Sequence, residues 1–316
     1  MVFVYAVLGL IILLLAGDSL VKGAVNLSLR VGIPALIVSL TIVAFGTSAP
    51  ELLISINAAL EGVPGIALGN VVGSNVANVL LVLGVPALIA VMHTSQCDSR
   101  KSFLHMIGAT GLFIALAWRG VFDWIAGIIL LAVLALILLD AIRDALAHKR
   151  AGVVEEDLED PEGADPDMPW WKIGLFLVLG LIGLPLGADL LVDSAREIAA
   201  MFGVSDAVIG LTLVALGTSL PELATTVMAA IRRQADVALG NVIGSNMFNL
   251  LAIIGVAALI APMPVDPAFL RFDLWVMAAA SLILVPFVFL GRDLGKVWGV
   301  VLTALYLVYI AVVLHG

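Results

Sequence analysis

The sequence contains two copies of one segment, one in each half of the chain. Residues 40–84 and 211–255 align without a gap, and 23 of their 45 positions are identical. The first copy reads LTIVAFGTSAPEL and ALGNVVGSNVANVLLVLG, where the second reads LTLVALGTSLPEL and ALGNVIGSNMFNLLAIIG. A repeat of this length predicts two similar halves whose repeated segments meet at the centre of the fold.

Both halves consist of apolar runs that are long enough to cross a bilayer as helices. Hydrophobic residues make up 62% of the 316 residues and charged residues 12%, whereas roughly 25% are charged in an average soluble domain. A helix needs about 20 apolar residues to cross the hydrocarbon core. The pattern therefore predicts an all-α polytopic membrane protein with ten transmembrane helices. The predicted spans are 2–22, 33–59, 64–92, 102–118, 121–147, 171–195, 205–231, 236–261, 271–290 and 296–314.

Each predicted half contains five spans, the first over 1–148 and the second over 170–316. Because five is odd, the second half crosses the membrane in the opposite sense, which predicts two inverted repeats with the substrate site near the midplane. The same gapless alignment, extended toward the N-terminus, pairs Asp18 with Asp189. The first span thus has a counterpart and is predicted to belong to the fold rather than to a removed signal peptide.

The basic residues predict the orientation in the membrane, because they concentrate in cytoplasmic loops. Twelve of the 15 lie in or beside alternate loops, which predicts that both termini face outward and that the loop 149–169 is cytoplasmic. This loop contains eight acids between Glu155 and Asp167, which is typical of a solvated linker. The twelve are Lys22, Arg30, Arg100, Lys101, Arg143, Lys149, Arg150, Lys172, Arg232, Arg233, Arg292 and Lys296.

Two glutamates, Glu51 and Glu222, lie inside the repeated apolar runs. An ionised carboxylate at the centre of a bilayer costs several kcal/mol, and such groups usually mark ion pathways. The four predicted spans that contain the repeat have no Lys or Arg that could balance the two charges. These spans are 33–59, 64–92, 205–231 and 236–261. We therefore expect mobile cations or protons to balance them; the alternative is a protonated pair that is hydrogen-bonded to its neighbours.

The glutamates are accompanied by hydroxyl and amide side chains at helical spacing. Thr47 and Ser48 lie within one turn of Glu51, and Ser74 shares a helix face with Asn78. Such oxygen ligands suit Ca²⁺ or Na⁺ and disfavour zinc or copper. Two carboxylates also match the charge of one divalent ion. The second half repeats the set as Thr218, Ser219, Glu222, Ser245 and Asn249.

The repeated spans also contain residues that interrupt a helix or bring helices close. Pro50 and Pro221 remove an amide donor and free the carbonyl four residues earlier, which belongs to Gly46 or Gly217. In these loosened segments the carbonyls near Ala44 and Ala215 become candidate ligands; a simple packing kink is the alternative. The glycines of GNVVGSN and GNVIGSN allow close helix approach. Four further asparagines either hold broken helix ends together or bind ions directly. They are Asn70, Asn75, Asn241 and Asn246.

These motifs resemble the two α-repeats of the sodium/calcium exchangers in the cation/Ca²⁺ antiporter superfamily. The similarity lies in GTSAPE with GSNVAN and in GTSLPE with GSNMFN. It implies that Glu51 and Glu222 bind Ca²⁺ and also Na⁺, and that spans 1 and 6 slide past a rigid core. The other ligands implied by the resemblance are Thr47, Ser48, Thr218, Ser219, Ser74, Ser245, Asn78 and Asn249, with the carbonyls of Ala44 and Ala215.

The resemblance implies a prokaryotic inner-membrane antiporter that extrudes Ca²⁺ in exchange for Na⁺, is electrogenic and acts by alternating access. It implies no enzymatic activity, no cofactor, no nucleic-acid partner and function as a monomer in the lipid bilayer. A Ca²⁺/H⁺ exchanger of the same fold is the alternative, and a passive cation channel is a further one. GTSxPE in place of the GNxxE pattern of the proton branch favours Na⁺. Asn249 stands where many relatives have aspartate, which puts K⁺ co-transport in doubt.

Overall fold

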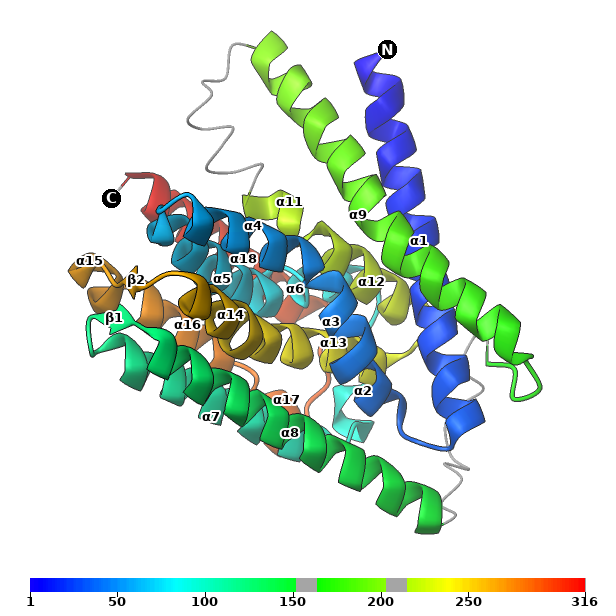
Figure 1. The fold of residues 1–316 in the computed structure, drawn as a ribbon. Helices are drawn as coiled ribbons and strands as arrows, with labels where there is room; N and C mark the ends of the chain where they lie inside the picture. Colours follow the sequence, from blue (N-terminus) through cyan, green and yellow to red (C-terminus); the bar gives the residue numbers. More distant parts are fainter. Residues whose placement is uncertain (152–163, 203–214, 316) are drawn as a thin grey trace.

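The computed structural model describes residues 1–151, 164–202 and 215–315, and these ranges are almost entirely helical (Figure 1). The all-α prediction is therefore confirmed for this part of the chain. Most of the predicted acidic linker and the start of the predicted span 205–231 lie outside the described residues. The first half contains α1 (Val2–Val31), α2 (Ala35–Val38), the π-helix η1 (Ser39–Val43), α3 (Ala44–Thr47), α4 (Ala49–Leu60), α5 (Pro64–Leu80), α6 (Gly84–Ile89), the 3₁₀-helix η2 (Thr94–Gln96), α7 (Arg100–Ala117), strand β1 (Val121–Phe122) and α8 (Trp124–Ala151).

The second half follows a closely similar order of elements. Its only strand within the described ranges, β2 (Met263–Pro264), pairs antiparallel with β1 and so ties the two halves together. The helices are α9 (Trp170–Met201), α11 (Ala215–Thr218), α12 (Leu220–Ile231), α13 (Ala235–Met247), the π-helix η4 (Phe248–Ile253), α14 (Ile254–Ile260), α15 (Pro267–Arg271), α16 (Asp273–Leu282), α17 (Val285–Phe289) and α18 (Lys296–His315).

Seven helices of the described chain are long and apolar enough to cross a membrane. An eighth is added if α2–α3 and α4, which are bent by 45°, form one broken span. The predicted span 102–118 is helical as α7, but it is not among the seven. The seven are Val2–Val31, Pro64–Ile89, Trp124–Arg150, Trp170–Met201, Ala235–Ile260, Pro267–Phe289 and Lys296–Val313.

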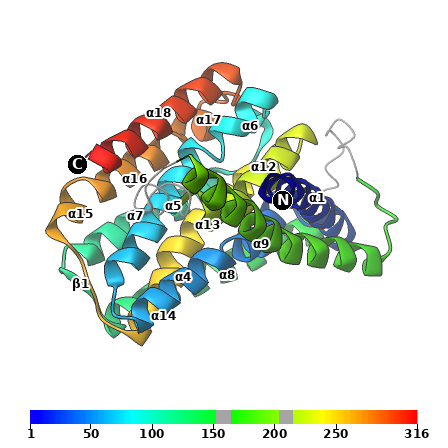
Figure 2. The ribbon, with the colours of Figure 1, turned by 90° about the horizontal axis from the view of Figure 1, so that it is seen from above.

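The repeated segments form the centre of the bundle. In Pro64–Ile89 and in Ala235–Ile260, 78% of the residues of the 18-residue apolar stretch are buried within the protein. The corresponding share is 17–39% in the other five long helices. Helix α13 packs on η1 and α7, and α5 packs on α4 and α16. The other helices surround this centre, as the view along the perpendicular direction in Figure 2 shows. The position that the sequence predicts for the repeats is thus the observed one.

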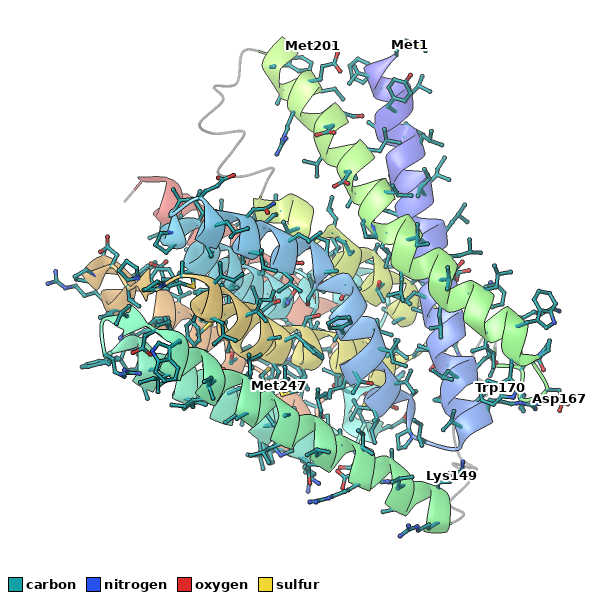
Figure 3. All side chains as sticks on the ribbon, in the orientation of Figure 1. Met1, Lys149, Asp167, Trp170, Met201 and Met247 are labelled. Atoms are coloured by element: carbon teal, nitrogen blue, oxygen red, sulfur yellow. The ribbon has the colours of Figure 1, made fainter. Side chains whose placement is uncertain are left out.

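Helices α1 and α9 form a separate antiparallel pair at one flank of the bundle (Figure 1). Met1 and Met201 lie at one end of this pair and Trp170 at the other, on the same side as Lys149 (Figure 3). Small residues let the two backbones approach closely, since a Cβ atom on Gly9 would lie 2.7 Å from the Leu191 nitrogen.

Both repeats break their helices at a serine that precedes the proline by two residues. Ser48 has φ −82° and ψ 6°, and Ser219 has φ −85° and ψ 2°. Pro50 and Pro221 lie in the first turn of α4 and α12, where a missing amide donor costs nothing. The prolines therefore start a second half-helix rather than kink a continuous one. The Ala44 carbonyl is not fully free, because it accepts a hydrogen bond from the Ser48 amide at 3.0 Å.

Candidate cation-binding site

The two intramembrane glutamates lie in the first turns of the half-helices α4 and α12. Glu51 is 1% exposed and Glu222 is completely buried. A helix N-terminus stabilises a negative charge, but in this site the two carboxylates also repel one another. Each helix break thus places one carboxylate in the protein interior at the meeting point of the repeats.

Hydroxyl groups of the first repeat meet Glu222 of the second. The Ser48 hydroxyl donates to Glu222 Oε1 at 3.4 Å. The hydroxyls of Thr47 and Ser245 lie 3.4 Å apart, and Thr47 also donates to Asn241 Oδ1 at 3.2 Å. The sequence predicts these residues as two separate sets, and the structure brings the two sets together.

Several buried oxygen atoms of the predicted set have no hydrogen-bond partner among the described residues. Such atoms are rare in folded proteins and indicate a missing ligand or water. The six belong to carboxylate, hydroxyl and amide groups, which are the oxygen types that bind Ca²⁺ and Na⁺. They are Glu51 Oε2, Glu222 Oε2, Ser74 Oγ, Ser219 Oγ, Asn78 Oδ1 and Asn249 Oδ1.

Two of the four additional asparagines each connect a helix that carries a glutamate to the helix that follows it. Asn70 on α5 donates to the Glu51 carbonyl and to the Ser55 hydroxyl, both at 3.2 Å. Asn241 on α13 makes the equivalent bonds to the Glu222 carbonyl at 3.4 Å and to Thr226 at 3.2 Å. These amide groups hold α4 against α5 and α12 against α13. Of the two roles considered for these asparagines, holding helix ends together and binding ions directly, the contacts fit the first.

The remaining predicted ligands, Thr218 and Ala215, belong to the short helix α11. Thr218 ends α11 and lines a cavity of about 160 Å³, together with Pro50 and with Asp189 and Asp193 of α9. Ala215 begins α11. The cavity therefore reaches from two exposed acids to a residue of the predicted ligand set.

The counterpart of Asp189 in the first repeat has different surroundings. Asp18 on α1 forms ion pairs with Arg232, which follows α12, and with Lys22 at 2.9 Å. The sequence alignment identifies Asp18 and Asp189 as equivalent, but it does not indicate that, within the described ranges, only Asp18 forms an ion pair with a basic residue across the helix interface.

These features define the class of protein: a helical membrane protein whose duplicated broken helices bury two carboxylates among hydroxyl and amide groups. The sodium/calcium exchanger protein family matches residues 1–142 and 172–315. The chain therefore belongs to the sodium/calcium exchanger family, whose members are transporters rather than enzymes.

Relatives and solved structures cover nearly the whole chain. The sodium/calcium exchanger MaX1 of Methanosarcina acetivorans is 33% identical over 344 aligned residues, covering 99% of this chain and 98% of the relative. The inner membrane protein YrbG of Escherichia coli is 33% identical over 306, covering 96% and 94%. A structure of the sodium-calcium exchanger NCX_Mj, soaked with Na⁺ and Sr²⁺, has 33% identity and a TM-score of 0.82, covering 98% of this chain and 97% of its own.

Proposed function

We propose that this protein is an antiporter that exchanges Na⁺ for Ca²⁺ across the membrane at the site formed by Glu51 and Glu222. The observation that carries this proposal is the burial of two carboxylates in predicted spans that contain no basic residue, next to amide and hydroxyl oxygens that have no hydrogen-bond partner in the described part of the chain. Membership of the exchanger family and the likeness to NCX_Mj support the same conclusion.

The charges of the site couple the two fluxes. One Ca²⁺ neutralises the two carboxylates, and two Na⁺ are the minimum that does so, whereas a partly filled site leaves a carboxylate charge buried at membrane depth, which costs several kcal/mol. A filled site can therefore switch from opening to one side of the membrane to opening to the other, and a partly filled site cannot. Because the two ions use the same oxygen atoms, their occupancy is mutually exclusive, which is the requirement for exchange rather than leak.

The proposed topology has ten spans in two inverted repeats of five. The α1–α9 pair runs antiparallel although its helices are equivalent in sequence, and the contacts of Asn70 recur at Asn241, its counterpart in the second repeat. In this topology α7 is the fourth span, and α11 and α12 belong to the seventh. The distribution of basic residues supports an orientation with both termini outside and the linker in the cytoplasm, and the likeness to an inner membrane protein supports an inner-membrane location.

The proposal predicts Ca²⁺ uptake that depends on a Na⁺ gradient. Purified protein in liposomes preloaded with Na⁺ should take up ⁴⁵Ca²⁺ when diluted into Na⁺-free buffer with the pH clamped. Liposomes preloaded with K⁺ or choline serve as the control and should show only the background. Uptake that ignores Na⁺ and follows a pH gradient would instead assign the protein to Ca²⁺/H⁺ exchange, because carboxylates can also carry protons.

The proposed exchange moves net charge, with more than two Na⁺ for each Ca²⁺. Uptake of Ca²⁺ into Na⁺-loaded liposomes then carries positive charge outward, so an inside-positive potential should accelerate it. The potential is set with valinomycin and a K⁺ gradient, and the initial rate of ⁴⁵Ca²⁺ uptake is compared with that at zero potential. Equal rates would mean that two Na⁺ exchange for one Ca²⁺.

A further inference from the structure

Two chains of hydrogen bonds lead from the candidate cation site to methionine sulfur atoms. In the first chain, Asn249 Nδ2 donates to Asn75 Oδ1 at 3.0 Å. Asn75 Nδ2 donates in turn to the Asn246 carbonyl at 3.2 Å and to Met277 Sδ at 3.9 Å. Both asparagine side chains are buried, so no bulk water competes for these bonds.

The second chain has the same order of groups. Asn78 Nδ2 donates to Asn246 Oδ1 at 3.1 Å, and Asn246 Nδ2 donates to Met106 Sδ at 3.7 Å. In the gapless alignment of the two halves, Met106, Asn75 and Asn78 pair with Met277, Asn246 and Asn249. The repeat therefore includes the methionines, although they lie on α7 and α16, beyond the segment with the strongest identity.

We propose that Asn75 and Asn246 are positioning residues, which fix the orientation of the Asn249 and Asn78 amides so that both present oxygen to the transported ion. The inference rests on the proposed function. A primary amide has an oxygen end and an NH₂ end of nearly the same shape, and a half turn exchanges them. Only the oxygen end binds a cation, so an asparagine ligand works only when its orientation is determined.

The direction of each chain follows from the acceptors at its outer end. A thioether sulfur and a backbone carbonyl accept hydrogen bonds but do not donate them. They require the NH₂ group of Asn75 to point outward, which turns its oxygen toward Asn249. Asn249 must then give its own NH₂ group to that oxygen. Its Oδ1 atom is left without a partner among the described residues, as is that of Asn78.

This arrangement also decides between the two interpretations of Asn75 and Asn246. In both side chains the oxygen and the nitrogen take part in bonds to protein groups, and the exposed fractions are 2% and 1%. The oxygen of each accepts a hydrogen bond from an inner asparagine, whereas the oxygens of Asn78 and Asn249 have no partner among the described residues and are the ones open to an ion. Asn75 and Asn246 act on the ion through the inner asparagines.

A double-mutant cycle tests the proposal. In Asn75→Leu the new side chain has a similar volume but neither accepts nor donates a hydrogen bond, so the apparent affinity for ⁴⁵Ca²⁺ should fall about 10-fold. The affinity is measured by equilibrium binding to purified protein and by the half-saturating Ca²⁺ concentration for uptake. In the Asn249→Ala background, which has no amide to orient, Asn75→Leu should have less than about a 2-fold further effect. Asn57→Leu, at an exposed position of α4, is the matched control and should bind like wild type.

The cycle separates orientation from a general structural role. Wild-type affinity in Asn75→Leu, or the same 10-fold loss in both backgrounds, would overturn the proposal. The pair Asn246→Leu and Asn78→Ala provides an independent cycle if Asn75→Leu does not fold, as judged by size-exclusion chromatography. Failure of both leucine variants to fold would assign the outer asparagines to folding and also overturn it. Absence of Na⁺-dependent uptake in wild type would contradict the proposed function alone, because Ca²⁺ binding would still report on the cycle.

Discussion

Glu51→Gln and Glu222→Gln are each expected to lower Na⁺-dependent Ca²⁺ uptake about 100-fold or more while the protein still folds. Glutamine keeps the shape of the side chain but removes one of the two charges that balance a Ca²⁺ ion. Loss of one partner of a buried charge pair costs about 3–5 kcal/mol, and each 1.4 kcal/mol is a factor of ten. The measurement is the initial rate of ⁴⁵Ca²⁺ uptake in Na⁺-loaded liposomes.

The control for this change is Glu61→Gln, at an exposed glutamate directly after α4. This variant removes one glutamate charge from the first repeat, as Glu51→Gln does, and it should transport like wild type. The melting temperatures of Glu51→Gln and Glu222→Gln should equal or exceed that of wild type, because each variant removes a charge that is buried without a basic partner in the repeated spans. Uptake at more than half the wild-type rate in both variants would refute the proposed site.

Gly244→Ala is expected to lower uptake more than 10-fold and to lower the melting temperature by several degrees. A Cβ atom at this position would lie 2.5 Å from the Leu40 carbonyl oxygen and 2.6 Å from the Ala44 Cβ atom. Helix α13 would have to move away from η1 and α3, which would separate Ser245 from Thr47 in the candidate site. Overpacking of this kind costs about 1–3 kcal/mol. Uptake and thermal unfolding of the purified protein measure the two effects.

Gly108→Ala on α7 is the matched control, since no described atom lies within 4 Å of a Cβ atom at that position. Alanine is the better helix former by about 1 kcal/mol, so this variant should be as stable as wild type or slightly more stable. If Gly244→Ala matched it in both uptake and melting temperature, the close contact between α13 and α3 would not be needed for the site.

Much of the candidate site follows from the sequence because the repeat identifies its residues twice. Glu51 and Glu222 are conspicuous in apolar surroundings, and their hydroxyl and amide neighbours recur at the same spacing. The two halves share one interface, and their most similar segments lie where the two copies meet. The observed contact of Ser48 with Glu222 is a direct result of that arrangement.

The directions of the hydrogen bonds could not be predicted from the sequence, because they depend on which groups meet across the repeats. Asn75 and Asn70 have the same side chain in the same motif, yet Asn75 bonds to the second repeat and Asn70 stays within the first. The exact position of each helix break could not be predicted either, since a proline is compatible both with a kink and with the first turn of a new helix. Extending the gapless alignment of the two halves to spans 4 and 9 would have identified Met106 and Met277.

The pairing of Asp18 with Arg232 makes the two ends of the molecule unequal. Glu61 and Asp189 occupy the corresponding positions of the other repeat, and two acids cannot form such a contact. In a perfectly symmetric duplicate, the conformations open to either side would have the same free energy, so half of the molecules would adopt each one. The Asp18–Arg232 ion pair is one contact that removes this degeneracy. In the proposed alternating-access cycle, it would shift the resting distribution between the two conformations whether or not an ion is bound.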